Sequence, residues 1–395
     1  SFTIYNIYKK NIRMGKIYTA MGLMSGTSLD GVDVSIIKSD GNREFSSILD
    51  RYFEYDKELI EEILNIREKI TDSEKLNSNL NEIRDLERKI TLFHVKAVNE
   101  VLGISKSSVD LIGFHGQTIF HNPQKKITKQ IGDGKLLSQL TKKNVVYNFR
   151  QNDLENEGQG APLTPIFHNA LANKINKEFN LGFPINILNI GGISNITSTV
   201  SWENLGQINK IYAFDIGPGN CMIDEWIRKN SKKKYDKDGL IASSGTTDEL
   251  VLNQALENFT ENSNFKKSLD VKDFDVFFAK GLSLENGAAT ITNFTAALIA
   301  NGMNHCFQIN RTGINKWLVC GGGRKNKYLL ESIKNNFEKI NIEPIDHYGI
   351  DGDFVESQAF AYLAIRSFLK LPISFPDTTG CKEPSTGGQL IKIFD

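Results

Sequence analysis

The order of strand-like and helix-like segments in the first half of the chain occurs again in the second half. Each half opens with three short apolar runs separated by turns, the pattern of a β-meander. Helical runs then alternate with further apolar runs, as in α/β domains. Strands are expected at residues 17–24, 32–36, 45–53, 109–114, 145–149, 185–190, 196–200, 211–214 and 317–320, and helices at 58–67, 72–102, 161–179, 222–227, 330–337 and 354–369. The repetition predicts a duplicated α/β core with a cleft between two lobes.

The length of 395 residues exceeds what one hydrophobic core usually holds, so two domains are expected. We place the first lobe at residues 1–165 and the second at residues 166–365, with a C-terminal segment from about residue 366 to 395 packing back on the first lobe. Lys+Arg and Asp+Glu both number 47, and this zero net charge argues against nucleic acid as the main partner. The four cysteines form no CxxC pair, which favours a reducing cytoplasm over a disulfide-rich compartment.

Two segments bear on membranes and targeting. Residues 286–304 carry no charge but contain four Asn and three Thr, so they predict a buried helix and not a membrane span. Residues 1–13 lack the apolar centre of a signal peptide, and Met14 is an alternative natural start.

Glycine-rich turns follow three of the expected strands, at residues 25–33, 215–220 and 321–323. Glycine lets a backbone come close to a ligand, and backbone N–H groups bind phosphate without a counter-charge. Each turn alone is also consistent with a purely structural role, but three together favour nucleotide binding. Thr27 and Ser28 add hydroxyl donors, and Asp30 adds a carboxylate for a metal. The chain lacks GxxxxGK[ST], and no GxGxxG lies between a strand and a helix, so neither a P-loop nor a Rossmann site is supported.

Asp215 follows an expected strand and precedes a helix, a place where a carboxylate can act as general base. The alternative is that Asp215 caps the helix, although Asn220 is the better placed cap. His115 and His121 flank a Gly-Gln-Thr turn, where they either bind a polar ligand or are structural; a third metal ligand is not apparent. Residues 159–162 are expected to open a helix with Pro162 in its first turn, and their N–H groups either face a substrate or only begin the helix.

A series of motifs from Met21 to Ala364 resembles the anhydro-N-acetylmuramic acid kinases. The motifs are MGLMSGTSLDGVD (residues 21–33), HGQT (115–118), GQGAP (158–162), NIGGISN (189–195), DIGPGN (215–220), CGGGRKN (320–326) and ESQAFA (356–361). Seven motifs in one order are far more specific than any single glycine-rich loop.

The resemblance implies the two-lobed, ribonuclease-H-like fold of the actin-like ATPase superfamily, which includes sugar kinases and heat-shock chaperones. It also implies an activity: 1,6-anhydro-N-acetylmuramic acid, ATP and water would give N-acetylmuramic acid 6-phosphate and ADP during peptidoglycan recycling. The implied cofactors are ATP and Mg²⁺, and the implied setting is a homodimer in the bacterial cytoplasm without a membrane partner.

The resemblance carries roles onto individual positions. Asp215 matches the catalytic carboxylate. The ATP-binding set is Gly26, Thr27, Ser28, Leu29, Asp30, Gly31, Val32, Asp33, Gly217, Gly219, Asn220, Gly321, Gly322 and Gly323. The sugar-binding set is His115, Gln117, Gln159, Gly160 and Glu356. The metal ligand stays open, with Asp30 and Asp215 as candidates.

Two positions depart from the family or superfamily pattern. Glu157 stands where many members have glycine, which puts the fine shape of the sugar loop in question. Gly22 lies where the wider superfamily often has Asp-x-Gly, so a magnesium ligand is not carried over there. Two other functions remain as alternatives: an ordinary sugar kinase acting on a free hydroxyl, and an actin-like or chaperone-like ATPase that binds protein.

Overall fold

Two β-sheets with one shared topology form the framework of the structure, a computed structural model. The strands of these sheets are β1 (Tyr18–Met24), β2 (Gly31–Ser39), β3 (Phe45–Glu54), β4 (Leu111–Phe114), β7 (Asn144–Tyr147) and β13 (Gln389–Ile391), and then β8 (Ile185–Ile190), β9 (Ile193–Ser198), β10 (Tyr212–Pro218), β11 (Lys316–Cys320) and β12 (Asn341–Pro344). In each sheet three antiparallel strands form a meander, and two further strands run parallel to the first of them.

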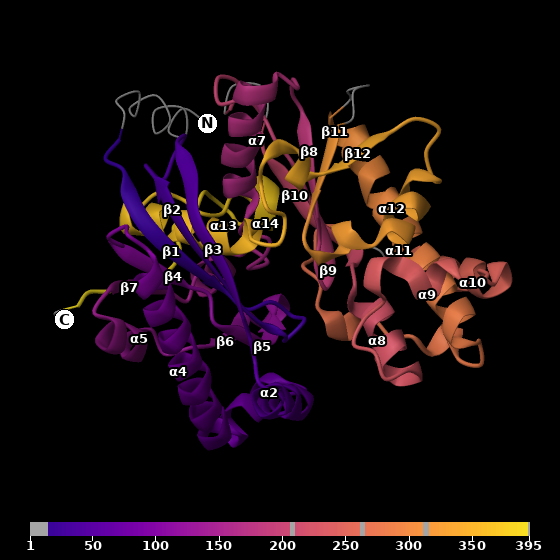
Figure 1. The fold of residues 1–395 in the computed structure, drawn as a ribbon, viewed down its shortest axis with the longest axis horizontal. Coiled ribbons are helices and arrows are strands. Elements are labelled where there is room, and N and C mark those ends of the chain that lie inside the picture. The colour runs from indigo at the N-terminus through magenta and orange to yellow at the C-terminus, as the bar shows by residue number, and fades with distance from the viewer. Residues whose placement is uncertain (1–14, 206–209, 261–264, 311–315, 394–395) are drawn as a thin grey trace. The chain divides into compact units, whose positions relative to one another are not determined.

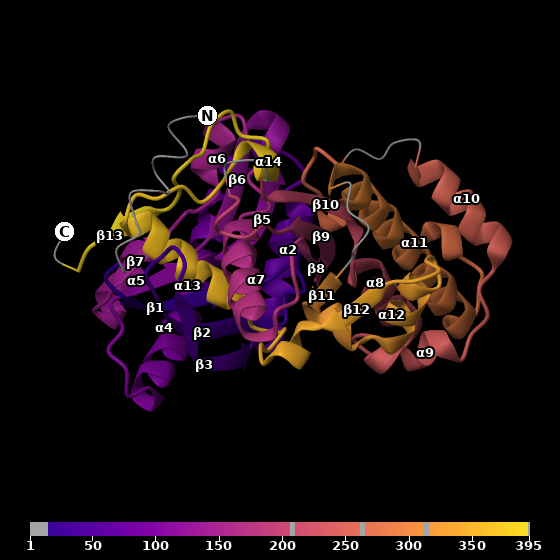
Figure 2. The same ribbon diagram turned by 90° about the horizontal axis from the view of Figure 1, so that it is seen from above.

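The strand orders are β3-β2-β1-β4-β7 and β10-β9-β8-β11-β12. Figure 1 labels these strands of both sheets. Strand β13 adds an antiparallel edge beside β7 (Figure 2). A separate hairpin consists of β5 (Gln117–Asn122) and β6 (Ile127–Ile131). The repeated order confirms the predicted duplicated α/β fold, with a ribonuclease-H-like sheet in each half.

The structure describes residues 15–205, 210–260, 265–310 and 316–393. Contacts divide the chain into two units, residues 1–178, 200–211 and 354–395 forming the first and residues 179–199 and 212–353 the second. The lobe boundaries and the cleft that the sequence predicts stay predictions. Met14, the alternative start, lies outside the described residues.

Helices connect the strands of both units. They are α2 (Lys57–Lys69), α3 (Ser73–Ser78), α4 (Leu80–Ile104), α5 (Gly134–Thr141), α6 (Gln151–Glu155), α7 (Pro165–Phe179), α8 (Cys221–Asn230), α9 (Leu240–Ser243), α10 (Glu249–Thr260), α11 (Leu284–Asn310), α12 (Lys327–Lys334), α13 (Val355–Phe368) and α14 (Pro376–Thr379). On α8 the predicted apolar face is buried as expected.

Helix α13 packs closely on β1, β2 and β4 of the first unit (Figure 1). Gly22 and Gly113 are paired on neighbouring strands beneath it. A Cβ atom at Gly22 would lie 1.8 Å from the Ser357 carbonyl oxygen, and one at Gly113 would lie 2.3 Å from that of Phe360. The departure at Gly22 therefore has a packing reason, because an aspartate side chain has no room under α13.

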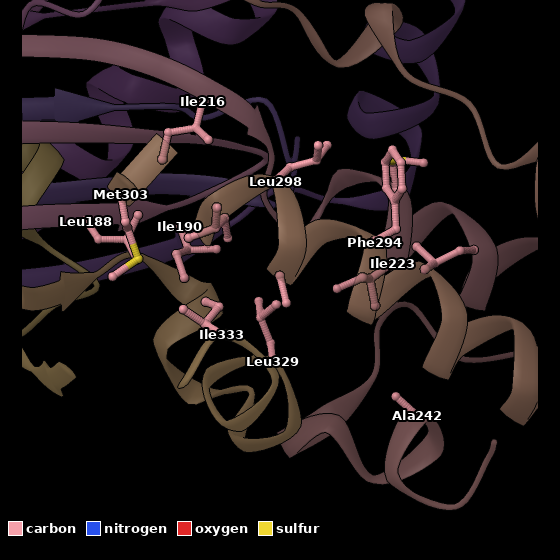
Figure 3. Close-up of a cluster of buried hydrophobic side chains, with 14 of the residues drawn as sticks. Leu188, Ile190, Ile216, Ile223, Ala242, Phe294, Leu298, Met303, Leu329 and Ile333 are labelled. Atoms are coloured by element: carbon pink, nitrogen blue, oxygen red, sulfur yellow. The ribbon is translucent and has the colours of Figure 1, made fainter. Parts of the chain in front are cut away.

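The core of the second unit lies between its sheet and α8, α11 and α12. Leu188 and Ile190 of β8 meet Leu298 and Met303 of α11, and Ile333 of α12 completes the contact (Figure 3). Helix α11 contains the uncharged stretch of residues 286–304, which is confirmed as a buried helix. Within the described ranges, none of the helices combines the length and the hydropathy that a membrane span requires.

Candidate active site

The turn between β1 and β2, predicted to bind phosphate, is fixed by side chains from other segments. Ser25 Oγ lies 2.5 Å from the Tyr55 hydroxyl, and Gln117 Nε2 donates to the Gly26 carbonyl over 3.1 Å. Leu29 at the tip has a φ of 58°, unusual for a side chain other than glycine, and its side chain is buried in the core of the first unit. Such anchoring holds backbone N–H groups in place, which phosphate binding requires.

Asp30 ends this turn. Its carboxylate accepts a hydrogen bond from Ser28 Oγ over 2.6 Å, and its carbonyl accepts from the Tyr52 hydroxyl and the Tyr55 N–H, both at 2.9 Å. The residue is exposed, so its carboxylate can contribute one ligand to a metal that arrives with phosphate. Among the described residues, no three His, Cys, Asp or Glu side chains cluster as a metal cage.

Arg150 joins three predicted sugar-site segments of the first unit, although it was not among the residues predicted from the sequence. Its Nε donates to His115 Nε2 over 3.1 Å, and its Nη1 donates to the Gly160 carbonyl over 2.9 Å. The guanidinium lies 5.9 Å from the centre of the Phe360 ring, and its charge acts on Glu356. The only signal in the sequence was its position after a strand, at the end where ligands of α/β sheets gather.

The protonation of this cluster follows from burial. Burial and then the charge of Arg150 hold the pKa of His115 well below its usual value, so the ring is neutral. Because Nε2 accepts from Arg150, Nδ1 carries the proton and donates it to the Gly116 carbonyl over 2.7 Å. Burial raises the pKa of Glu356, and Arg150 partly offsets that rise. His115 therefore orients Arg150 near neutral pH and does not itself transfer a proton.

The loop at residues 157–162 is built around the carboxylate of Asp153, which is 1% exposed. Asp153 Oδ2 accepts from the Gly160 N–H over 2.7 Å, and Oδ1 accepts from the Thr379 hydroxyl over 2.6 Å. The Gln159 N–H donates to the Thr379 carbonyl over 2.9 Å. A Cβ atom at Gly158 would lie 2.1 Å from Asp153 Oδ2, so only glycine leaves room for this carboxylate.

The prediction that Pro162 lies in the first turn of a helix is wrong. Helix α7 begins at Pro165, three residues later. Gly160 has a φ of 73° and its N–H is bound by Asp153, so the chain reverses here before it can become helical. The N–H groups that were expected to begin a helix instead shape the loop.

Glu157 has a φ of 70°, the left-handed conformation that glycine adopts readily. Glutamate in place of glycine at this position therefore strains the backbone, while the loop keeps the conformation that glycine would adopt. We expect Glu157→Gly to raise the free energy of unfolding by about 0.5–1 kcal/mol in urea titrations. Glu157→Ala is the matched control, since it removes the charge but keeps the Cβ atom. An equal gain in both variants would mean that charge and not strain is responsible.

Asp215 lies within β10, which continues to Pro218, so the prediction that the strand ends at residue 214 is wrong. A β-bulge shifts the register between Asp215 and Gly217, and bulges commonly re-aim side chains near active sites. Asp215 is paired with Asn195 and Asn195 with Asn189, so the three side chains share one face of the sheet. Asp215 Oδ2 accepts from the Leu269 N–H over 2.9 Å, which fixes the orientation of a carboxylate that is 7% exposed.

Asn220 occupies the N-cap of α8, as expected, but makes no side-chain capping bond. The N–H groups of Gly219 and Asn220, predicted to bind nucleotide, donate instead to the carbonyls of Gly192 and Gly191 over 2.8 and 2.7 Å. A Cβ atom at Gly322 would lie 3.7 Å from Asn220 Nδ2, so the two predicted segments meet here. A role for Asn220 toward a nucleotide would therefore use its side chain.

Arg324, also missed in the sequence, holds the loop of residues 321–323 after β11. Its guanidinium donates to Asp346 over 2.7 Å, to Asp353 over 2.6 Å and to the Gly321 carbonyl over 3.1 Å, and lies 3.4 Å from Asp351. Only 6% of its side chain is exposed. The Gly321 N–H donates to the Gly352 carbonyl over 2.9 Å, so the loop is tied on both sides.

The predicted site residues thus fall into two sets, one in each unit. In the first unit, Gln117 reaches the phosphate turn, while His115 and Gly160 accept hydrogen bonds from Arg150, whose charge also acts on Glu356. Residues 31–33 begin β2. In the second unit, Asp215 and Gly217 lie on β10, and residues 219–220 and 321–323 form the neighbouring loops.

Comparison with known sequences gives one consistent result. The family model described as "Anhydro-N-acetylmuramic acid kinase" matches residues 18–392. An anhydro-N-acetylmuramic acid kinase of Pelagibacter ubique is 54% identical over 385 residues, covering 96% of this chain and 100% of that protein. One of Agrobacterium fabrum is 38% identical over 387 residues, with 96% and 100% covered. Among solved structures, the activator of the 2-hydroxyisocaproyl-CoA dehydratase from Clostridium difficile with bound ADPNP is 11% identical, covers 89% of this chain and 96% of that one, and has a TM-score of 0.40.

Proposed function

The chain belongs to the anhydro-N-acetylmuramic acid kinase family, and from that premise we propose that it opens the anhydro ring of 1,6-anhydro-N-acetylmuramic acid and phosphorylates O6. The protein is an ATP-using kinase of peptidoglycan recycling. One water, one sugar and one ATP give N-acetylmuramic acid 6-phosphate and ADP.

The arrangement around Arg150 is the observation that carries the sugar site. His115, Gly160 and Phe360 come from segments far apart in the sequence and contact one guanidinium, whose charge also acts on Glu356. Arginine suits the planar carboxylate that muramic acid carries, and the neutral His115 ring fixes its orientation. This supports a site for an acidic sugar on the first unit.

Asp215 is the proposed general base. It accepts a proton from the water that attacks the anomeric carbon, while the bond from that carbon to O6 breaks. The released O6 attacks the γ-phosphorus, and the bond to the leaving ADP oxygen breaks. The Leu269 N–H orients the Asp215 carboxylate for this task.

The described residues fit a Mg²⁺ ion that is held mainly by the nucleotide. Mg²⁺ commonly binds through phosphates, waters and one or two carboxylates, and Asp30 is the proposed carboxylate here, with Asp215 as the alternative. When bound, the ion neutralises charge on the phosphate groups. Asp30, fixed by Ser28, would hold it beside the turn whose N–H groups would bind phosphate.

We expect Gly26→Val to weaken ATP binding without loss of fold. A Cβ atom at Gly26 would meet only Ser28 Oγ, at 3.8 Å, so the variant folds, while its side chain crowds the approach of phosphate to the turn. Calorimetry with a non-hydrolysable ATP analogue measures the affinity. Gly31→Val is the contrast, since its Cβ atom would lie 2.2 Å from the Phe53 carbonyl oxygen and should disrupt the hairpin. Unchanged affinity in a folded Gly26→Val protein would remove this turn from the nucleotide site.

An ADP-release assay tests the function directly, with the anhydro sugar, N-acetylmuramic acid and N-acetylglucosamine as substrates. Turnover of the anhydro sugar in ¹⁸O-labelled water should place the label at the anomeric carbon, analysed early because free anomeric hydroxyls exchange. Turnover of only the ring-open sugars would identify an ordinary sugar kinase instead.

The setting of the enzyme is proposed on the same basis. The need for ATP supports a cytoplasmic location, and the family resemblance supports a homodimer. Zero formal net charge is consistent with small-molecule partners in place of nucleic acid. Sedimentation equilibrium tests the dimer, because a monomer at micromolar concentration would contradict it.

A further inference from the structure

The C-terminal segment of the chain is hydrogen-bonded to the loop at residues 157–162 and to residues 152–156 just before it. Besides the two contacts of Thr379, the Lys382 N–H donates to the Asn156 carbonyl over 3.0 Å, and Asn152 Nδ2 donates to the Thr386 carbonyl. These bonds join parts of the first unit that are more than two hundred residues apart in the sequence. Only one of them involves a buried carboxylate, that of Asp153.

The two carboxylate oxygens of Asp153 accept hydrogen bonds from two different residues. Thr379 occupies Oδ1 and the Gly160 N–H occupies Oδ2. Gly160 is bound on its other side as well, because its carbonyl accepts from Arg150. One residue of the loop, Gly160, is thus held through its N–H by a buried carboxylate and through its carbonyl by the guanidinium that reaches His115. Hydrogen bonds to a charged group are stronger than neutral ones, so this arrangement sets where the loop lies.

We infer that Asp153 is a positioning residue for the proposed sugar loop and that Thr379, from the C-terminal segment, holds Asp153 in the required orientation. The inference rests on the proposed function for the identity of the ligand. In this proposal neither side chain contacts the sugar itself. Thr379 fixes the carboxylate, the carboxylate fixes Gly160, and Gly160 fixes Arg150 through its carbonyl.

Thr379→Val tests this with little change in shape, because valine replaces the hydroxyl by a methyl group. We expect the Michaelis constant for the anhydro sugar to rise about tenfold, the loss expected for one hydrogen bond to a charged group, while that for ATP changes less than about twofold. Thr379→Ser keeps the hydroxyl and should restore the normal value. Asp153→Asn should behave like Thr379→Val, and the double variant should be less impaired than the two single effects combined.

Thr378→Val is the matched control. Thr378 is a buried neighbour on the same short helix, and its hydroxyl bonds to the backbone of Phe375 and not to Asp153. This variant should leave both Michaelis constants unchanged. Equal changes for sugar and ATP in Thr379→Val, or no change in a folded protein, would overturn the inference.

Hydrogen exchange separates this inference from the proposed function. In the full-length protein without ligand, the Gly160 amide should exchange faster in Thr379→Val than in the parent and in Thr378→Val. An unchanged rate would refute the role of Thr379 whatever the substrate is. Faster exchange with an unaltered sugar Michaelis constant would show that the loop does not position sugar, which also overturns the inference. Failure of the parent enzyme to turn over any sugar would count against the proposed function alone.

Discussion

Asp215→Asn should lower turnover of the anhydro sugar by about 10²- to 10⁴-fold, the range typical for loss of a positioned general base. Water is a poor nucleophile, and ring opening requires that its proton be removed as the bond to O6 breaks. Asparagine has the shape of aspartate and keeps an oxygen that can accept from the Leu269 N–H, but it cannot take that proton. ATP affinity should largely survive, since backbone N–H groups and not this carboxylate are proposed to hold the phosphates. Single-turnover kinetics and nucleotide calorimetry measure the two quantities.

Asp270→Asn is a suitable control for this prediction. Asp270 follows Leu269 directly, and its carboxylate accepts from the Lys272 N–H in a short helical turn. Like Asp215→Asn, the Asp270→Asn substitution removes one carboxylate charge, and it alters the loop that contains Leu269. Turnover should nevertheless stay near normal. Comparable losses in both variants would show that the loop, and not a base at Asp215, accounts for the effect.

The topology could be predicted from the sequence because it rests on local patterns. Alternating or continuous apolar runs mark each strand of both meanders, and a β-meander needs only short turns. The duplication could be predicted because the order of strand-like and helix-like segments in the first half occurs again in the second half. The end of β10 was missed because its last residues, including Gly217 and Pro218, look like a turn, while the bulge that keeps them paired depends on β9.

The supporting residues of the site were hidden because their partners are remote. Arg150 becomes informative only when folding brings it to His115 and Gly160, and Asp153 only when Thr379 arrives from the other end of the first unit. Pro162 and Pro165 also show that the start of a helix can depend on contacts that the sequence does not reveal. Both suit a first helical turn, and the bond from Gly160 to Asp153 decides between them. Glycine-rich motifs were visible in the sequence, but the groups that hold them in place were not.

Arg324→Met should cost about 2–3 kcal/mol of folding free energy in the second unit, less than a fully buried ion pair because its partner carboxylates are partly exposed. The variant leaves Asp346, Asp351 and Asp353 close together without their shared cation. It also removes the hydrogen bond to the Gly321 carbonyl, which helps to hold the predicted ATP-binding loop. Both the stability and the ATP affinity should therefore fall. Arg324→Lys should restore little, since a single ammonium cannot reach partners on several sides. Denaturant titration and nucleotide calorimetry give the two readouts.

The pH dependence of the stability lost in Arg324→Met provides an independent check. Burial raises the pKa values of Asp346 and Asp353, but hydrogen bonds from Arg324 outweigh it and hold both below the usual value. A carboxyl whose pKa is depressed by folding stabilises the protein fully above its unfolded pKa, near 4, and loses that contribution as the pH falls through the folded value. The difference in the free energy of unfolding between the parent protein and Arg324→Met should therefore become smaller below about pH 4. Lys325→Met is the matched control: Lys325 also pairs with Asp353 but is 58% exposed, so its loss should cost at most about 1 kcal/mol. If Arg324→Met were no less stable than Lys325→Met, the buried guanidinium would not be what holds this loop.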